Sequence, residues 1–349
     1  MGNCLGIQFI KLKQGARTGL KLLWKDKENV AVEIDDSAEE HTVYVSDDSS
    51  NEDWLIVSKS NEGYRPLKNS QESKKKKKGH RITKVKTGFI ILQFRVYIYI
   101  FVGNLIHLQD AVEECFAPLT DEEEALVSRA LSYSDRREVL VSHPNCNIDI
   151  TGENLMCLSP GGWLNDDVIN LYLVLLKERE ERESHKFLKC HFFNTFFYKK
   201  LISGGGYNFQ SVRKWTTQKK LGYSLLDCEK IFVPIHQGAH WCLAIINKKD
   251  KKFEYLDSLK GFDIQVLHVL AKYYVDEVKD KNKEDVDITS WKAEFVTEHP
   301  EQENGFDCGM FMIKYVDFYS RDVGLCFDQR DMPYFRRRTA KEILKLRAE

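Results

Sequence analysis

Three short apolar segments separated by turns lie between residues 231 and 258, and they constrain the fold more than any other part of the chain. Residues 231–235 and 240–246 are apolar runs of strand length, and residues 253–257 follow a polar stretch, 247–252, that is typical of a tight turn. The last two segments therefore predict an antiparallel hairpin. In such a hairpin the start of one strand lies opposite the end of the other, so we expect His240 and Asp257 to lie close together.

An imidazole beside a carboxylate suggests the orienting pair of a nucleophilic triad. The carboxylate of Asp257 would fix the tautomer of the His240 imidazole and stabilise the imidazolium. His236 is an alternative base four residues earlier, but it lies beyond the end of its strand and less directly opposite Asp257.

The nucleophile has to come from another part of the chain, and Cys308 in the segment Asn304-Gly305-Phe306-Asp307-Cys308-Gly309 fits that role best. Asn-Gly is typical of a turn, and the residues that follow predict a mostly buried helix. The positive end of that helix and an imidazolium would both favour the thiolate, which is the attacking form. Gln302 offers a side-chain amide to a developing oxyanion.

Each of these residues also has an ordinary structural explanation. A buried cysteine is often a small hydrophobic residue, a strand histidine a satisfied core residue, and an aspartate at a strand end a turn residue. Sequence spacing alone does not bring Cys308 to His240. A metal site is disfavoured because Cys190-His191 has no second pair of ligands at zinc spacing.

The overall charge and the cysteine pattern exclude several other classes of protein. Lys and Arg number 52 against 53 Asp and Glu, so no global field favours nucleic acid or a membrane surface. The nine cysteines occur singly, without CxxC pairs, in a chain of 349 residues. This pattern favours reduced thiols in the cytosol or nucleus over a disulfide scaffold.

We expect residues 1–115 to form a largely disordered N-terminal region. Residues 26–87 are polar, and the region holds a basic run, 74–78, that resembles a nuclear import signal or is a solvated basic stretch. Residues 89–108 form an apolar stretch of unclear role, because a mid-membrane Arg such as Arg95 costs about 3 kcal/mol. Gly2 with Cys4 offers possible acylation sites, with an ordinary disordered start as the alternative. Residues 43–48 resemble SUMO-interacting motifs, with a solvated tail as the alternative.

From residue 116 onward the sequence is typical of a globular domain. Thr120 with Glu123 forms a capping box that predicts a helix from Asp121 towards Leu131. A second helix is predicted after Trp163, where Asn165 or Asp166 can cap and apolar residues recur at helical spacing.

Four blocks in this order resemble the SUMO-specific, or ubiquitin-like-specific, cysteine proteases, and most closely the plant members of that family. The resemblance covers about residues 116–349, the expected catalytic domain. The blocks are Trp163-Leu164-Asn165-Asp166-Asp167-Val168-Ile169-Asn170, Val233-Pro234-Ile235-His236 with His240-Trp241, Tyr255-Leu256-Asp257-Ser258, and Gln302 with Asn304-Gly305-Phe306-Asp307-Cys308-Gly309. The resemblance implies an α+β, papain-like fold with a small central antiparallel sheet flanked by helices.

The resemblance also implies roles for individual residues. His240, Asp257 and Cys308 would form the triad and Gln302 would serve the oxyanion hole. Trp163 and Trp241 would form the walls of a tunnel that admits only a Gly-Gly tail. Asp166 would make an ionic contact with basic residues of SUMO, with helix capping as its alternative role. The implied reactions are maturation of SUMO precursors and release of SUMO from lysines of conjugated proteins at an isopeptide bond.

Three other functions remain as alternatives. The chain would be a protease for another modifier such as NEDD8, a non-catalytic SUMO-binding adaptor, or an acyltransferase, although nothing in the sequence signals a cofactor pocket. We expect a monomer that acts on SUMO and SUMO-conjugated proteins without a cofactor, a metal or a nucleic acid. We expect the protein in the nucleus, the cytoplasm or both; the tail features point towards the nucleus and a membrane without deciding between them.

Overall fold

The structure, a computed structural model, describes residues 109–132 and 136–349. All of them belong to the unit that spans Phe94–Glu349. The predicted features at Gly2 and Cys4, at 43–48, at 74–78 and at 89–108 lie outside the described residues. Within the described ranges, no helix has the length and apolar character needed to cross a bilayer.

The described chain alternates short helices with two sheets. Residues 109–115 are helical, and the division of the chain at residue 116 stays a prediction. The helices are α3 (Asp121–Ser132), α4 (Gly152–Leu155), α5 (Asp166–Arg182), α6 (Phe197–Leu201), α7 (Gln218–Leu221), α8 (Ile264–Asn282), α9 (Cys308–Ser320) and α10 (Met332–Leu344). The strands are β1 (Val139–His143), β2 (Ile148–Thr151), β3 (Cys190–Phe192), β4 (Lys230–Gln237), β5 (His240–Asn247), β6 (Lys252–Leu256) and β7 (Lys292–Phe295).

The larger sheet has the order β3-β4-β5-β6-β7, and β1 with β2 forms a separate hairpin. Its three central strands pair antiparallel, so the predicted hairpin between β5 and β6 is confirmed. Each edge strand, by contrast, pairs parallel with its neighbour. The expected α+β fold is therefore confirmed, with a mixed rather than a purely antiparallel sheet.

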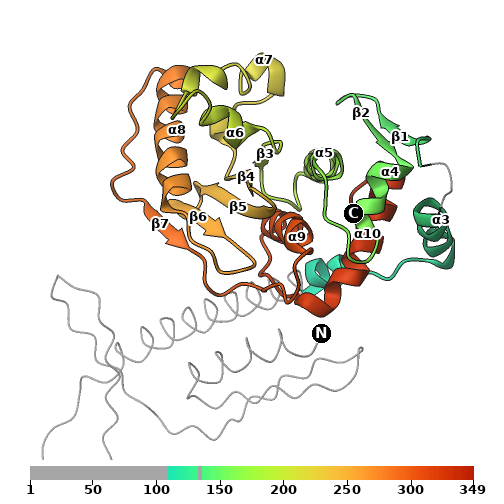
Figure 1. Ribbon diagram of the computed structural model, residues 1–349. Coiled ribbons are helices and arrows are strands. Elements are labelled where there is room, and N and C mark those ends of the chain that lie inside the picture. Colours follow the sequence, from blue (N-terminus) through green and yellow to red (C-terminus); the bar gives the residue numbers. More distant parts are fainter. Residues whose placement is uncertain (1–108, 133–135) are drawn as a thin grey trace, which may run out of the picture. The chain divides into compact units, whose positions relative to one another are not determined.

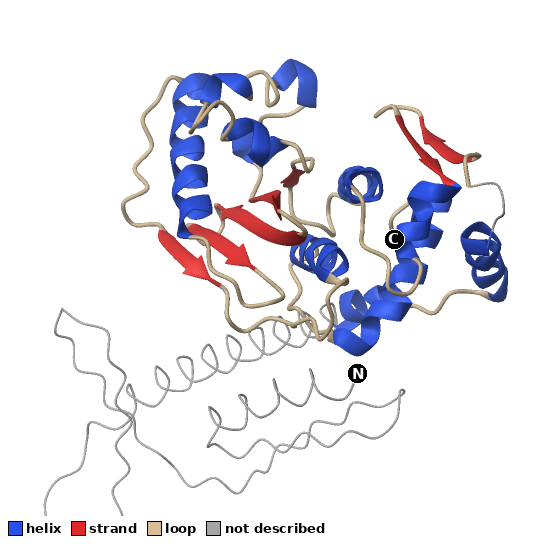
Figure 2. Cartoon of the chain, in the orientation of Figure 1, coloured by secondary structure: helices blue, strands red, loops and turns tan. Residues whose placement is uncertain are grey.

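Helices cover both faces of this sheet (Figures 1 and 2). Along β5, Trp241, Leu243 and Ile245 pack into the core that contains α5 and α9. The alternate residues Ala244 and Ile246 pack into a second core, which contains α8. This alternation follows from the two-residue period of a strand, and it explains why β5 is apolar throughout.

The predicted helices form where their start signals lie. At α3, the main-chain N–H of Thr120 donates to Glu123 and that of Glu123 donates to the Thr120 hydroxyl, which completes the capping box. Asn165 rather than Asp166 caps α5, since its side chain accepts from Val168 N at 2.9 Å. Neither α8 nor α10 was predicted from the sequence.

A buried charge cluster ties α9 to α5. The carboxylate of Asp317 on α9 accepts from Arg179 at 2.7 Å and from Tyr172 at 3.2 Å, both on α5. It also accepts from Lys314 at 3.1 Å and from Arg321 at 3.0 Å. Burial by itself raises the pKa of the Asp317 carboxyl, but the three cations hold this pKa well below its usual value. The cluster therefore depends on one carboxylate.

Replacing Asp317 by Asn is expected to lower the free energy of unfolding by about 3–5 kcal/mol, because buried cations then lose their counter-charge. Urea denaturation measures this loss. The control is Asp285→Asn, in an exposed pair with Lys279, where we expect little loss because solvent screens the pair. Equal losses in the two variants would contradict the assignment of Asp317 as the centre of the cluster.

Candidate active site

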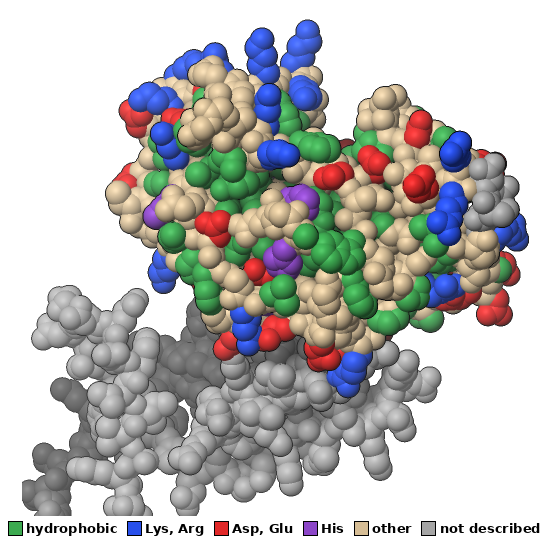
Figure 3. Space-filling model, viewed as in Figure 1, with side chains coloured by type: hydrophobic (Ala, Val, Ile, Leu, Met, Phe, Trp, Pro, Cys, Tyr) green, Lys and Arg blue, Asp and Glu red, His purple; other side chains and the backbone are tan. Residues whose placement is uncertain are grey.

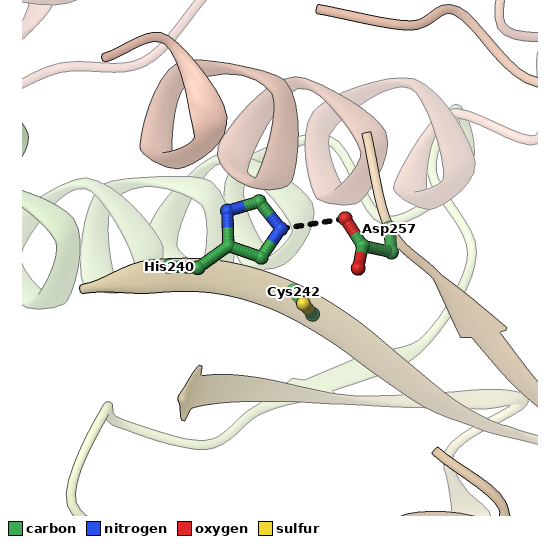
Figure 4. A group of neighbouring side chains, drawn as sticks. All are labelled: His240, Cys242 and Asp257. Carbon is green, nitrogen blue, oxygen red and sulfur yellow. Dashed lines mark hydrogen bonds and ion pairs between the residues drawn. The ribbon is translucent and has the colours of Figure 1, made fainter. Parts of the chain in front are cut away.

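The structure brings the side chains of His240 and Asp257 together, as Figure 4 shows. Nε2 of His240 lies 2.5 Å from Oδ1 of Asp257, within hydrogen-bonding distance. His240 is the first residue of β5, and Asp257 directly follows β6. The strand register pairs Leu243 with Leu256, so one step further it sets Cys242, not His240, directly opposite Asp257.

The turn after β6 holds the carboxylate of Asp257 with main-chain N–H groups. Leu259 N donates to Oδ1 at 2.8 Å, and Gly261 N donates to Oδ2 at 3.1 Å. A Cβ at Gly261 would lie 2.2 Å from Oδ2, so this close approach requires glycine. Main-chain groups of the turn therefore hold both oxygens of Asp257 independently of the bond to His240.

Cys308 is the first residue of α9 and is 3% exposed. No side chain caps this helix, since its N-cap residue Asp307 makes no side-chain cap bond. The N-terminal N–H groups of α9 thus remain available to stabilise negative charge near Cys308.

The electrostatics of Cys308 and His240 favour an ion pair. Burial raises the pKa of the Cys308 thiol, but hydrogen bonding to His240, backbone N–H groups of Trp241 and Gly309 and the charge of His240 lower it below its usual value. The pKa of His240 is raised well above its usual value, first by the hydrogen bond to Asp257 and then by bonds to Cys242 and Cys308. The thiolate and the imidazolium therefore coexist between these two pKa values.

Gln302 is buried, and its amide has one defined orientation. Ser258 Oγ donates to Oε1 of Gln302 at 2.6 Å, so Nε2 lies on the opposite side and donates to the carbonyl of Asn304 at 2.5 Å. The main-chain N–H of Gln302 also donates to the carbonyl of Ser258 at 3.0 Å. Since an amide nitrogen carries two protons, one donor of Gln302 remains for another acceptor.

The two tryptophans of the predicted tunnel differ in exposure. Trp163 is 53% exposed, whereas Trp241 is 5% exposed and donates from Nε1 to the carbonyl of Leu164 at 3.3 Å. A Cβ at Gly309 would lie 2.8 Å from Leu164 Cβ, so the glycine after Cys308 permits α9 to approach this segment closely. Hydrophobic and histidine side chains lie together near the middle of the face in Figure 3, with acidic side chains beside them.

His236, the alternative base, has a different partner. Its ring stacks on Trp241 with ring centroids 4.2 Å apart, and the register places these two residues opposite each other.

Asp166 lies in the first turn of α5, where Asn165 already provides the cap. The neighbouring Asp167 accepts from Asn154 at 2.8 Å. The role of Asp166 as an ionic contact stays a prediction.

Sequence reasoning missed the thiol of Cys242 and the turn at Gly261. His240, Cys242 and Asp257 have possible ligand atoms within 4.8 Å of one another (Figure 4). Because the imidazole and the carboxylate lie at 2.5 Å, they already bond to each other. The expectation that the chain holds no metal stays a prediction. Continuing the hairpin register would have found Cys242.

The chain is similar to a family of cysteine proteases over this whole region. Residues 162–348 match the family model described as the Ulp1 protease family, C-terminal catalytic domain. The ubiquitin-like-specific protease ESD4 of Arabidopsis thaliana is 63% identical over 236 residues, which cover 68% of this chain and 48% of that protein. The chain thus spans about half the length of that relative. A putative ubiquitin-like-specific protease 1B of the same plant is 61% identical over 237 residues, covering 68% of this chain and 70% of that protein.

A solved structure of the C-terminal Ulp1 protease domain in complex with Smt3, the yeast orthologue of SUMO, has a similar fold. Its TM-score is 0.55 at 30% identity, and the match covers 65% of this chain and 96% of that chain.

The pH dependence of Cys308 alkylation by iodoacetamide tests the ion pair. We expect a midpoint lower than that of an ordinary exposed thiol, because the hydrogen bond to His240 and its charge outweigh the effect of burial on the pKa of Cys308. In His240→Ala the midpoint should rise, since burial then acts without the imidazole to offset it. Peptide mass spectrometry separates Cys308 from Cys157, whose pKa burial raises to about 11.

His236→Ala is the control for this measurement, because the stacked His236 ring contacts Trp241. Its alkylation midpoint should match that of the unmodified chain. A shift in His236→Ala as large as that in His240→Ala would contradict the assignment of His240.

Gly261→Ala should displace the carboxylate of Asp257, because the added methyl would lie only 2.2 Å from Oδ2. We therefore expect the alkylation midpoint of Cys308 to rise in the same direction as in Asp257→Asn. Gly206→Ala is a matched control, since Gly206, like Gly261, does not have a positive φ, and nothing lies within 4 Å of its added Cβ. An unchanged midpoint in Gly261→Ala would show that the turn does not hold Asp257.

Proposed function

The chain belongs to the Ulp1 protease family, and we propose that it is a cysteine protease that cleaves after the C-terminal Gly-Gly of SUMO. The observation that carries this proposal is the bonded pair of His240 and Asp257, 2.5 Å apart, together with Cys308 at the start of α9, where His240 lowers the pKa of the thiol. Such a protease would mature SUMO precursors at a peptide bond and release SUMO from target lysines at an isopeptide bond. The relatives are named as ubiquitin-like-specific proteases, and the solved neighbour is in complex with Smt3.

In this proposal Cys308 is the nucleophile. Its thiolate attacks the carbonyl carbon of the terminal glycine, and an acyl-enzyme forms as the amine leaves. His240 donates its proton to that amine as general acid and then activates the water that hydrolyses the thioester. Asp257 keeps Nε2 of the imidazole occupied, so the other ring nitrogen is the one that serves Cys308.

Gln302 and the main-chain N–H groups at the start of α9 would stabilise the oxyanion. The support for Gln302 is the fixed orientation of its side-chain amide. The hydroxyl of Ser258 bonds to the amide oxygen, which leaves the amide nitrogen as the donor. The removal of one such donor typically lowers kcat by about 10² to 10³.

Trp163 and Trp241 would close over the tail of the modifier. The buried Trp241 would form a fixed wall, and the exposed ring of Trp163 would become buried when a ligand binds. Two indoles that enclose an extended peptide leave no room for side chains, so only a Gly-Gly segment fits.

The globular part of the modifier needs a second contact surface. The carboxylate of Asp166, in the first turn of α5, would contact a basic residue of SUMO there. We propose further that the protein acts as a monomer in the nucleus or the cytoplasm, without a cofactor or nucleic acid, and that any membrane contact depends on the N-terminal region.

Activity-based labelling tests this function. The full chain is incubated with SUMO, NEDD8 and ubiquitin, each carrying a C-terminal electrophile, and adducts are separated by gel electrophoresis. We expect an adduct with SUMO alone, and its complete loss in Cys308→Ser. Cys146→Ser is the matched control, because Cys146 is a partly exposed thiol on the β1–β2 hairpin, and it should label normally.

The other outcomes separate the alternative functions. Labelling of NEDD8 in place of SUMO would overturn the proposed specificity. Binding of SUMO without labelling would favour an adaptor. Turnover of a SUMO precursor and of a SUMO-lysine isopeptide conjugate then measures the two reactions separately.

A further inference from the structure

Arg336 on α10 joins two segments that lead to the proposed site. Its guanidinium is 4% exposed and donates twice to Oδ1 of Asp307, from Nε at 2.9 Å and from Nη2 at 2.6 Å. Its other N–H groups donate to the carbonyls of Cys157 at 2.8 Å, Ser159 at 3.1 Å and Gly162 at 2.7 Å. The rigid fork of a guanidinium is suited to such divergent bonds.

Each of these segments ends beside a residue of the proposed site. Asp307 is the N-cap residue of α9 and directly precedes Cys308. Gly162 directly precedes Trp163. The turn that supplies the carbonyls is tight, since a Cβ at Gly162 would lie 2.4 Å from the carbonyl oxygen of Cys157.

The carboxylate of Asp307 is fixed from its other side as well. Its Oδ2 accepts from Asn304 at 2.7 Å and from Gln329 at 2.8 Å. These bonds hold the carboxylate of Asp307 in place independently of Arg336. The guanidinium therefore sets the spacing between the start of α9 and the turn before Trp163.

We propose that Arg336 is a positioning residue that holds the nucleophile and the exposed tunnel wall at the separation an extended Gly-Gly segment requires. This inference rests on the proposed function, because the separation matters only for a substrate that lies between Cys308 and Trp163. Lysine at this position keeps the charge opposite Asp307, but a single ammonium does not span both the carboxylate and the carbonyls of the turn.

The test compares Arg336→Lys with Arg338→Lys. Arg338 lies on the same helix, is 2% exposed and pairs with Glu342 at 2.8 Å, so it is a matched buried control without a bond to either segment. We expect both variants to lose similar stability towards urea. Only Arg336→Lys should lose roughly 10- to 100-fold in kcat on a SUMO precursor, because small misplacements at a reacting centre cost that much.

Two further readouts separate positioning from folding. KM should change little in Arg336→Lys, since the globular contact with SUMO is elsewhere, and alkylation of Cys308 by iodoacetamide should change less than about threefold, because a small reagent does not thread between the walls. Gly162→Ala, which disturbs the turn but keeps the bond between Arg336 and Asp307, should reproduce the loss in kcat.

A double-mutant cycle completes the test. With Trp163→Ala as the background, Arg336→Lys should lower kcat much less than in the unmodified chain, because the wall that it positions is already absent. Additive losses, or equal losses in the two arginine variants, would overturn the positioning role. A chain that alkylates normally at Cys308 but never cleaves SUMO would instead overturn the proposed function.

Discussion

A thiolate at a buried position is the constraint on which the rest of this structure depends. Burial raises the pKa of the Cys308 thiol, so the thiolate is favoured only if nearby groups more than compensate for the lost hydration. The compensation comes from His240, whose own pKa is raised first by Asp257. Asp257 is held in turn by two main-chain N–H groups of the turn that follows β6. The chemistry thus rests on a backbone conformation.

That turn also connects the two halves of the proposed site. Asp257 bonds to the imidazole. The next residue, Ser258, donates from its hydroxyl to the side-chain amide oxygen of Gln302, and its carbonyl accepts from the main-chain N–H of Gln302. A single hairpin end therefore sets both the group that stabilises the imidazolium and the group proposed to stabilise the oxyanion. Since β6 lies inside the sheet, neighbouring strands hold this end in place.

Local patterns in the sequence predicted the parts of the fold that depend on neighbouring residues. The hairpin, the start of α3 and the start of α9 at Cys308 follow from turn residues, capping residues and apolar spacing. The parallel edge strands β3 and β7 were not predicted, because parallel pairing joins distant segments. The contacts of Arg336 were not predicted for the same reason, since its partners lie 29 to 179 residues away in the sequence.

Both ends of α9 are fixed by buried charge rather than by apolar packing alone. An apolar helix surface alone permits small rotations and axial shifts at little cost, whereas hydrogen bonds between charged groups are directional. Arg336 fixes the residue before Cys308, and the cluster around Asp317 fixes the third turn of the helix. Buried ion pairs add little net stability, because desolvation offsets their attraction. We infer that these buried pairs contribute geometry rather than stability. Two directional contacts determine where the sulfur of Cys308 lies relative to His240.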